Sequence, residues 1–190
     1  MAQAKTLTNK ELRQLLGYIS TQKHAARNRA LWLTGMYSGL RCKEIASLTL
    51  GDVWSAEEGV KYEVRLDPEQ TKGKYARTVF FPEKLRKELI AYIAGIDRSD
   101  TTKALFYTQK NSKRGFSPNT LAQTLHYLVK NAGLEGASSH SMRRSFITNL
   151  AAKGVGVRVL MSLAGHRNIS TTQAYIDVND DMKRRAVELI

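Results

Sequence analysis

The spacing of apolar residues predicts a mainly helical chain that extended structure interrupts once. Leucine and isoleucine recur three or four positions apart in residues 8–20, 82–95 and 117–131, the repeat of a helix with one buried face. Thr8 and Glu11 have the spacing of a capping box and are expected to begin the first helix. Further helices are expected at about 25–37 and 41–48, around Arg143, through Leu160 and Leu163 up to Gly165, and from 180 to 190.

Residues 53–81 follow a different pattern. Val60, Tyr62, Val64 and Leu66 alternate with polar residues, as Thr78 and Phe80 do less cleanly, which is typical of strands. The charged segment 68–75 contains Gly73 and is expected to form the turn of a hairpin. The predicted fold class is therefore α+β, mainly α-helical with a small antiparallel β-sheet or hairpin, in one domain over residues 1–190.

Two serines are predicted to cap helices near the C-terminus. Ser139 precedes the helix that carries Arg143, and Ser170 has a glutamine three positions later, as in a capping box. The second cap would place Tyr175 on a short helix.

Composition indicates the class of binding partner and the cellular compartment. The formal net charge is +13 and the pI is about 10.0, which favours binding to a polyanion such as nucleic acid. The single cysteine, Cys42, excludes an intramolecular disulfide and fits a reducing compartment. No apolar run is long enough to cross a bilayer, so a cytoplasmic, nucleoid-associated protein without membrane contact is expected.

Six polar residues stand in distinctive local settings. The settings are S-G-L-R-C-K-E-I (38–45), T-K-G-K (71–74), H-S-M-R-R (140–144), L-A-G-H (163–166) and T-T-Q-A-Y (171–175), and the residues are Arg41, Lys72, His140, Arg143, His166 and Tyr175. Such a set can break a phosphodiester without metal, because arginines neutralise phosphate oxygens, a tyrosine attacks, and lysine and histidine move protons. The histidines show no metal-binding spacing, so no metal ligand is predicted.

In this order the five motifs resemble the catalytic domain of the tyrosine recombinases, the phage integrase family. The resemblance implies DNA cleavage and rejoining through a 3′-phosphotyrosine on Tyr175, without metal, ATP or other cofactor. It also implies that Arg41, Arg143 and His166 bind the phosphate and that Lys72 is the general acid. His140 would then accept a proton or bind the phosphate.

The resemblance also implies supporting residues. Glu44 is expected to pair with His140 or with an arginine. DNA contacts are expected from the hairpin, from the basic loop that follows it in the chain and from the residue after Arg143: Lys74, Arg77, Lys113, Arg114 and Arg144.

The resemblance implies double-stranded DNA as partner and a homotetramer on two synapsed sites, formed from free monomers, with room for accessory DNA-bending proteins. Residues 180–190 are expected either to pass to a neighbouring subunit or to pack on their own domain. The family's N-terminal core-binding domain is not expected within residues 1–190, which would fit either a domain cut from a longer protein or a short recombinase like the fimbrial phase-switch invertases.

Two other functions share the same residues. A topoisomerase-like enzyme would use the same nucleophile without pairing two sites, and a non-catalytic DNA-binding module would have kept the scaffold alone. The small size and the integrase-style motifs favour the recombinase over the topoisomerase, and the intact residue set argues against the non-catalytic module.

Overall fold

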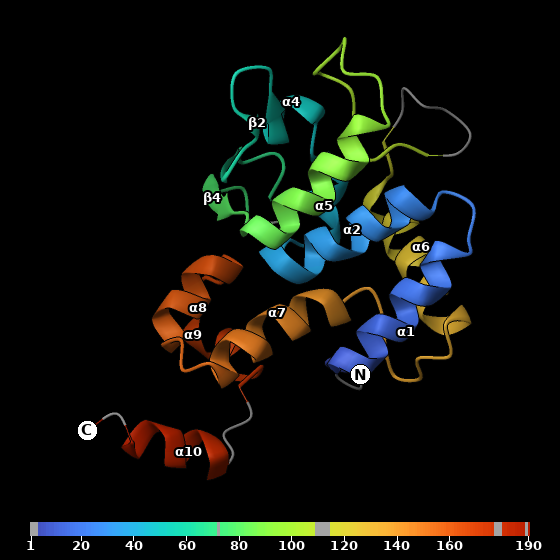
Figure 1. The fold of residues 1–190 in the computed structure, drawn as a ribbon. Helices are drawn as coiled ribbons and strands as arrows, with labels where there is room; N and C mark the ends of the chain where they lie inside the picture. Colours follow the sequence, from blue (N-terminus) through green and yellow to red (C-terminus); the bar gives the residue numbers. More distant parts are fainter. Residues whose placement is uncertain (1–3, 72, 109–114, 177–179, 189) are drawn as a thin grey trace.

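A computed structural model describes residues 4–71, 73–108, 115–176, 180–188 and 190. Helix α2 (Ala25–Ser38) lies at its centre and buries Leu31, Trp32 and Leu33. Figure 1 shows α2 between α5 (Glu83–Ala94) and α7 (Ser141–Ala152), and α2 also packs against α1 (Asn9–Ser20). Neighbours on several sides explain why α2 is buried around most of its circumference rather than along one stripe.

The surrounding helices follow the predicted pattern. The capping box at the start of α1 is present, because the Thr8 side chain accepts the Glu11 amide (3.2 Å) and Glu11 accepts the Thr8 amide (2.9 Å). The predicted apolar stripes are buried in α1, α5 and α6 (Pro118–Asn131). The predicted helical face is confirmed for all three helices, and the predicted capping box is confirmed for α1.

Two short antiparallel ribbons contain the strands of the described residues. Strand β1 (Trp54–Ser55) pairs with β2 (Gly59–Val60) after helix α4 (Leu50–Val53), and β3 (Glu63–Leu66) pairs with β4 (Arg77–Phe80). The register sets Glu63 opposite Phe80 and Leu66 opposite Arg77. The predicted hairpin and the mainly helical α+β class are confirmed.

Two aromatic residues of the alternating pattern lie outside the core. A bend between β2 and β3 turns Tyr62 outward, where its ring stacks on the Arg86 guanidinium (3.4 Å) and the residue is 62% exposed. In β4 the buried residue is Val79, so Phe80 points to solvent. The bend therefore moves the Tyr62 ring out of the core, and the register of β4 does the same for the Phe80 ring.

Four further helices carry or flank the polar motifs. They are α3 (Cys42–Ser47), α8 (Val157–Ala164), α9 (Ile169–Gln173) and α10 (Asp180–Val187). Helix α8 ends at Gly165, as predicted. Both serine caps are wrong: His140 occupies the N-cap of α7, and α9 is capped by Asn168, whose side chain accepts the Ser170 amide (2.9 Å).

Helix α10 lies apart from the other helices (Figure 1). In the part of the chain that the structure describes, no helix has both the length and the apolar character needed to cross a membrane.

Candidate active site

Four of the predicted residues meet where α8 ends. Arg41 is the N-cap of α3, and Arg143 lies in the first turn of α7. His166 follows Gly165, the C-cap of α8, and Tyr175 follows α9 in a turn rather than on the predicted helix. Segments that lie far apart in the sequence are thus brought to one end of one helix.

The last turn of α8 presents backbone carbonyls to arginines. The carbonyls of Met161 and Ser162 accept the amides of His166 (3.0 Å) and Gly165 (2.9 Å), a closure that the left-handed Gly165 permits. The next three carbonyls each accept a hydrogen bond from a guanidinium: Leu163 from Arg77 (2.9 Å), Ala164 from Arg143 (2.5 Å) and Gly165 from Arg41 (3.2 Å). Because a helix C-terminus carries partial negative charge, it attracts and orients these cations.

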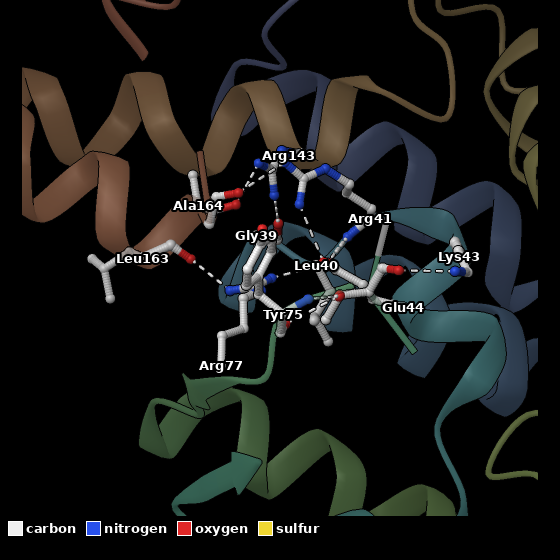
Figure 2. A network of polar contacts seen from close by, with 12 residues as sticks. Gly39, Leu40, Arg41, Lys43, Glu44, Tyr75, Arg77, Arg143, Leu163 and Ala164 are labelled. Carbon is white, nitrogen blue, oxygen red and sulfur yellow. Dashed lines mark hydrogen bonds and ion pairs between the residues drawn. The ribbon is translucent and has the colours of Figure 1, made fainter. Parts of the chain in front are cut away.

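Glu44 forms a bridge between two of these arginines, Arg41 and Arg77 (Figure 2). It is fully buried and forms ion pairs with Arg77 (2.9 Å) and Arg41 (3.2 Å), and it also accepts the Arg41 amide (2.7 Å). Burial alone would raise the pKa of Glu44, but Arg77 and Arg41 lower it below its ordinary value. Glu44 is therefore a carboxylate, and it pairs with arginines rather than with His140.

Arg143 is fixed from two sides. Besides Ala164 O, its guanidinium donates to Gly39 O (2.5 Å), and the residue is buried. Gly39 is left-handed (φ 67°), and an added Cβ would lie 2.5 Å from the Phe146 ring, so only glycine fits. The turn after α2 thus sets the position of Arg143.

The charges of this cluster do not cancel. Three guanidinium groups face one carboxylate, which leaves two positive charges among Arg41, Arg77, Arg143 and Glu44. Burial, followed by the neighbouring Arg41, lowers the pKa of Arg143 from its ordinary value. An arrangement of preorganised donors with surplus positive charge is suited to an anion.

His166 and Tyr175 stack face to face. Their ring centroids are 5.7 Å apart at an interplanar angle of 25°. The buried Thr172 hydroxyl lies 2.9 Å from His166 Nδ1. The Thr148 hydroxyl donates a hydrogen bond to the backbone carbonyl of Tyr175 (3.0 Å). Since Nδ1 has a partner, Nε2 is the ring nitrogen available to a substrate.

Burial and the neighbouring arginines keep His166 neutral at pH 7. Burial lowers the pKa of His166 to about 4, with Arg143, Arg41 and Arg77 acting in the same direction. A bound phosphate would oppose these arginines and raise that pKa again.

Comparison with known proteins matches this arrangement to one family. A sequence profile of the Phage integrase family matches residues 5–182. The chain belongs to the phage integrase family. It is 31% identical to the tyrosine recombinase XerA of Pyrococcus furiosus, a match over 97% of this chain and 61% of that protein. It is 30% identical to a tyrosine recombinase of Thermosipho africanus, with 96% and 60% covered.

Solved structures share the fold. The crystal structure of XerA recombinase matches with a TM-score of 0.76 at 24% identity, covering 100% of this chain and 66% of that one. A post-cleavage complex of XerH with a palindromic difH substrate matches with a TM-score of 0.71 at 22% identity, covering 96% and 51%. The chain thus spans about three-fifths of the length of the curated relatives named here. These relatives give no support to the narrower resemblance to fimbrial invertases.

Not every residue expected from the integrase resemblance joins the cluster. His140 is exposed, and among the residues that the structure describes its side chain makes no hydrogen bond with the other members. Lys74 is exposed with a left-handed backbone (φ 55°). Arg144 is half-buried, with its guanidinium 5.7 Å from the Tyr175 ring. Lys72, Lys113 and Arg114 lie outside the described residues.

Arg77 lies in a different setting from the one predicted. It was expected on the DNA-facing surface of the hairpin, but its guanidinium is enclosed between Glu44 and Leu163 O. These contacts support a role in holding the cluster together.

Sequence reasoning missed two of the supporting contacts. Thr172 binds His166, and Lys43 donates to Thr71 O (2.8 Å), the carbonyl directly before Lys72. The role of Lys43 could have been suspected from the sequence, since it lies between Arg41 and Glu44. The role of Thr172 had no signal beyond its place in the T-T-Q-A-Y motif.

No group of three His, Cys, Asp or Glu side chains within the described ranges is placed to hold a metal ion.

Proposed function

We propose that this chain is the catalytic part of a site-specific tyrosine recombinase that cleaves and rejoins double-stranded DNA. The observation that carries the proposal is the cluster at the end of α8, where Arg41, Arg143 and His166 are held in place and the Tyr175 ring lies against His166. The family's chemistry requires these four groups together.

The two arginines are suited to bind the scissile phosphate. A guanidinium has five N–H donors. Among the described contacts, Arg143 uses donors for Gly39 O and Ala164 O, and Arg41 uses donors for Glu44 and Gly165 O, so donors remain on both. Because the existing bonds fix each group before DNA arrives, little reorganisation is needed as charge develops on the phosphate.

The reaction proceeds by transesterification. The Tyr175 oxygen attacks phosphorus, the bond from phosphorus to the 5′-oxygen breaks, and a 3′-phosphotyrosine and a free 5′-hydroxyl result. Lys72 supplies the proton to the leaving oxygen, and His140 accepts the tyrosine proton or binds the phosphate. The 5′-hydroxyl of the same or another strand reverses the step, so the bond energy is retained and no cofactor is required.

The remaining roles follow from the family. Lys74, Lys113, Arg114 and Arg144 contact the DNA backbone around the cleavage site. The active assembly is a homotetramer on two synapsed sites, with residues 180–190 in a position to link subunits.

Covalent trapping tests the proposal. The protein is incubated with supercoiled plasmid in chelator, without magnesium, and quenched with detergent. Protein–DNA adducts are expected from wild type and from Tyr127→Phe, a matched control on the exposed face of α6, but not from Tyr175→Phe. Adducts that survive in Tyr175→Phe would refute the assignment of the nucleophile.

A further inference from the structure

Arg77, the first residue of β4, connects the hairpin to two parts of the candidate site, the end of α8 and helix α3. Its Nη1 donates to Leu163 O (2.9 Å) and its Nη2 to Glu44 (2.9 Å), as Figure 2 shows. The side chain is 14% exposed. One guanidinium therefore ties the end of α8 to α3, while its backbone belongs to the hairpin.

Arg77 also forms the surface against which the turn before His166 packs. A Cβ on Gly165 would lie 2.8 Å from Arg77 Cδ and 3.0 Å from Nε. Such an approach is possible only with glycine, whose left-handed backbone (φ 61°) closes α8. The Arg77 side chain therefore limits how closely this turn can approach the arginine cluster.

The contacts of Arg77 require the forked shape of a guanidinium. Its two acceptors come from different elements and lie on two different terminal nitrogens. Its buried Nε has no hydrogen-bond partner among the described residues, which indicates that the two acceptors, not Nε, fix the group. Lysine carries a point charge on a flexible stem, so it could keep the charge but not both bonds in this geometry.

We propose that Arg77 is a positioning residue for the cleavage step. The proposal rests on the proposed function and assigns to Arg77 no contact with DNA. Arg77 acts through Leu163 on the turn that carries His166, and through Glu44 on Arg41, since Glu44 shares its two oxygens between the two arginines. Without Arg77, Arg41 is the remaining ion-pair partner of Glu44. Glu44 then draws the Arg41 guanidinium away from Gly165 O, and the turn before His166 loosens.

The expected kinetic signature separates positioning from DNA binding. A displacement of about 1 Å in a catalytic group can slow a reaction by about 100-fold. For Arg77→Ala we expect covalent adduct formation at saturating DNA to fall about 100-fold, with the Kd for DNA changed by less than about threefold. Arg65→Ala removes the same charge from the exposed side of β3 and is expected to leave the cleavage rate at saturation unchanged.

Two further variants test the fork itself. Arg77→Lys keeps the charge and is expected to remain at least about tenfold slower than wild type. Millimolar guanidinium chloride is expected to restore part of the rate of Arg77→Ala, measured against the same concentration of sodium chloride. A wild-type rate for Arg77→Lys, or equal losses of DNA affinity in Arg77→Ala and Arg65→Ala with no loss at saturation, would overturn the proposal.

Amide hydrogen exchange tests the same idea without DNA. The amides of Gly165 and His166 are bonded to Ser162 O and Met161 O in the turn that Arg77 supports. In Arg77→Lys, which also serves if the alanine variant does not fold, these two amides are expected to exchange at least about tenfold faster while Leu89 in α5 is unchanged. Unchanged protection would overturn the proposal. Absence of any adduct from wild type, with protection lost in the variant, would contradict the proposed function alone.

Discussion

Replacing Gly165 with alanine measures how tightly the end of α8 packs on Arg77. Alanine must adopt a left-handed backbone (φ 61°), which costs about 1–2 kcal/mol. Its Cβ would lie 2.8 Å from Arg77 Cδ, so the guanidinium must also move. Losing one bond from that charged group costs about 1.5–3 kcal/mol. The expected total is about 3–5 kcal/mol.

Gly154→Ala is the matched control. Gly154 also has a left-handed backbone (φ 85°), but nothing lies within 4 Å of the position of an added Cβ. Its expected cost is the backbone term alone, about 1–2 kcal/mol. The excess for Gly165→Ala, about 2 kcal/mol, belongs to the displacement of Arg77.

Urea unfolding of the two variants, each in the wild-type and the Arg77→Ala background, isolates that excess. In Arg77→Ala the obstructing atoms are gone, so Gly165→Ala is expected to cost no more than Gly154→Ala. Equal costs for the two glycines in the wild-type background would refute the packing argument. An excess that persists without Arg77 would refute it as well.

Three further predictions concern the charges and the C-terminus. Glu44→Gln is expected to destabilise the fold by about 3 kcal/mol, because the buried Glu44 carboxylate is the counter-charge of two partly enclosed guanidinium groups. Glu63→Gln, on the exposed side of β3, is the control in urea unfolding, and equal costs would contradict the ion-pair account. Because the folded state holds the His166 pKa at about 4, below the ordinary 6.5, its contribution to stability is complete above pH 6.5 and is lost as pH falls toward 4. That loss is about 2 kcal/mol after allowing for solvent screening, and His166→Asn is expected to flatten this part of the stability–pH curve; an unchanged curve would show that another group titrates. Deleting residues 180–190 is expected to impair assembly on paired sites more than cleavage of a single site, measured by gel shift and by adduct yield, and equal losses would argue against exchange of this segment.

The gathering of Arg41, Arg143, His166 and Tyr175 could be predicted because the motifs that carry them, in this order, resemble those of the tyrosine recombinases. Glycines mark the turns after α2 and α8, and apolar spacing marks the helices between them. These local signals predicted the two glycine turns, but not the turn at Tyr175, where a helix was expected.

The setting of Arg77 could not be predicted, because it depends on a residue 33 positions away. An arginine in a basic hairpin resembles a solvated side chain, and only its contacts with Leu163 O and Glu44 enclose it. The cap of α9 failed for a local reason, since Asn168 and Ser170 both have capping side chains and Asn168 takes that position. Tyr62 left the predicted face because one bend reverses the alternation of a strand.

The measurement that tests the central claim most directly is the chemical identity of the trapped linkage. Adducts formed in chelator are digested with nuclease and protease, and the peptides are sequenced by mass spectrometry. The account predicts one modified peptide, with a nucleotide joined through its 3′-phosphate to Tyr175. A nucleotide on another residue, or a 5′-phosphate linkage at Tyr175, would contradict it.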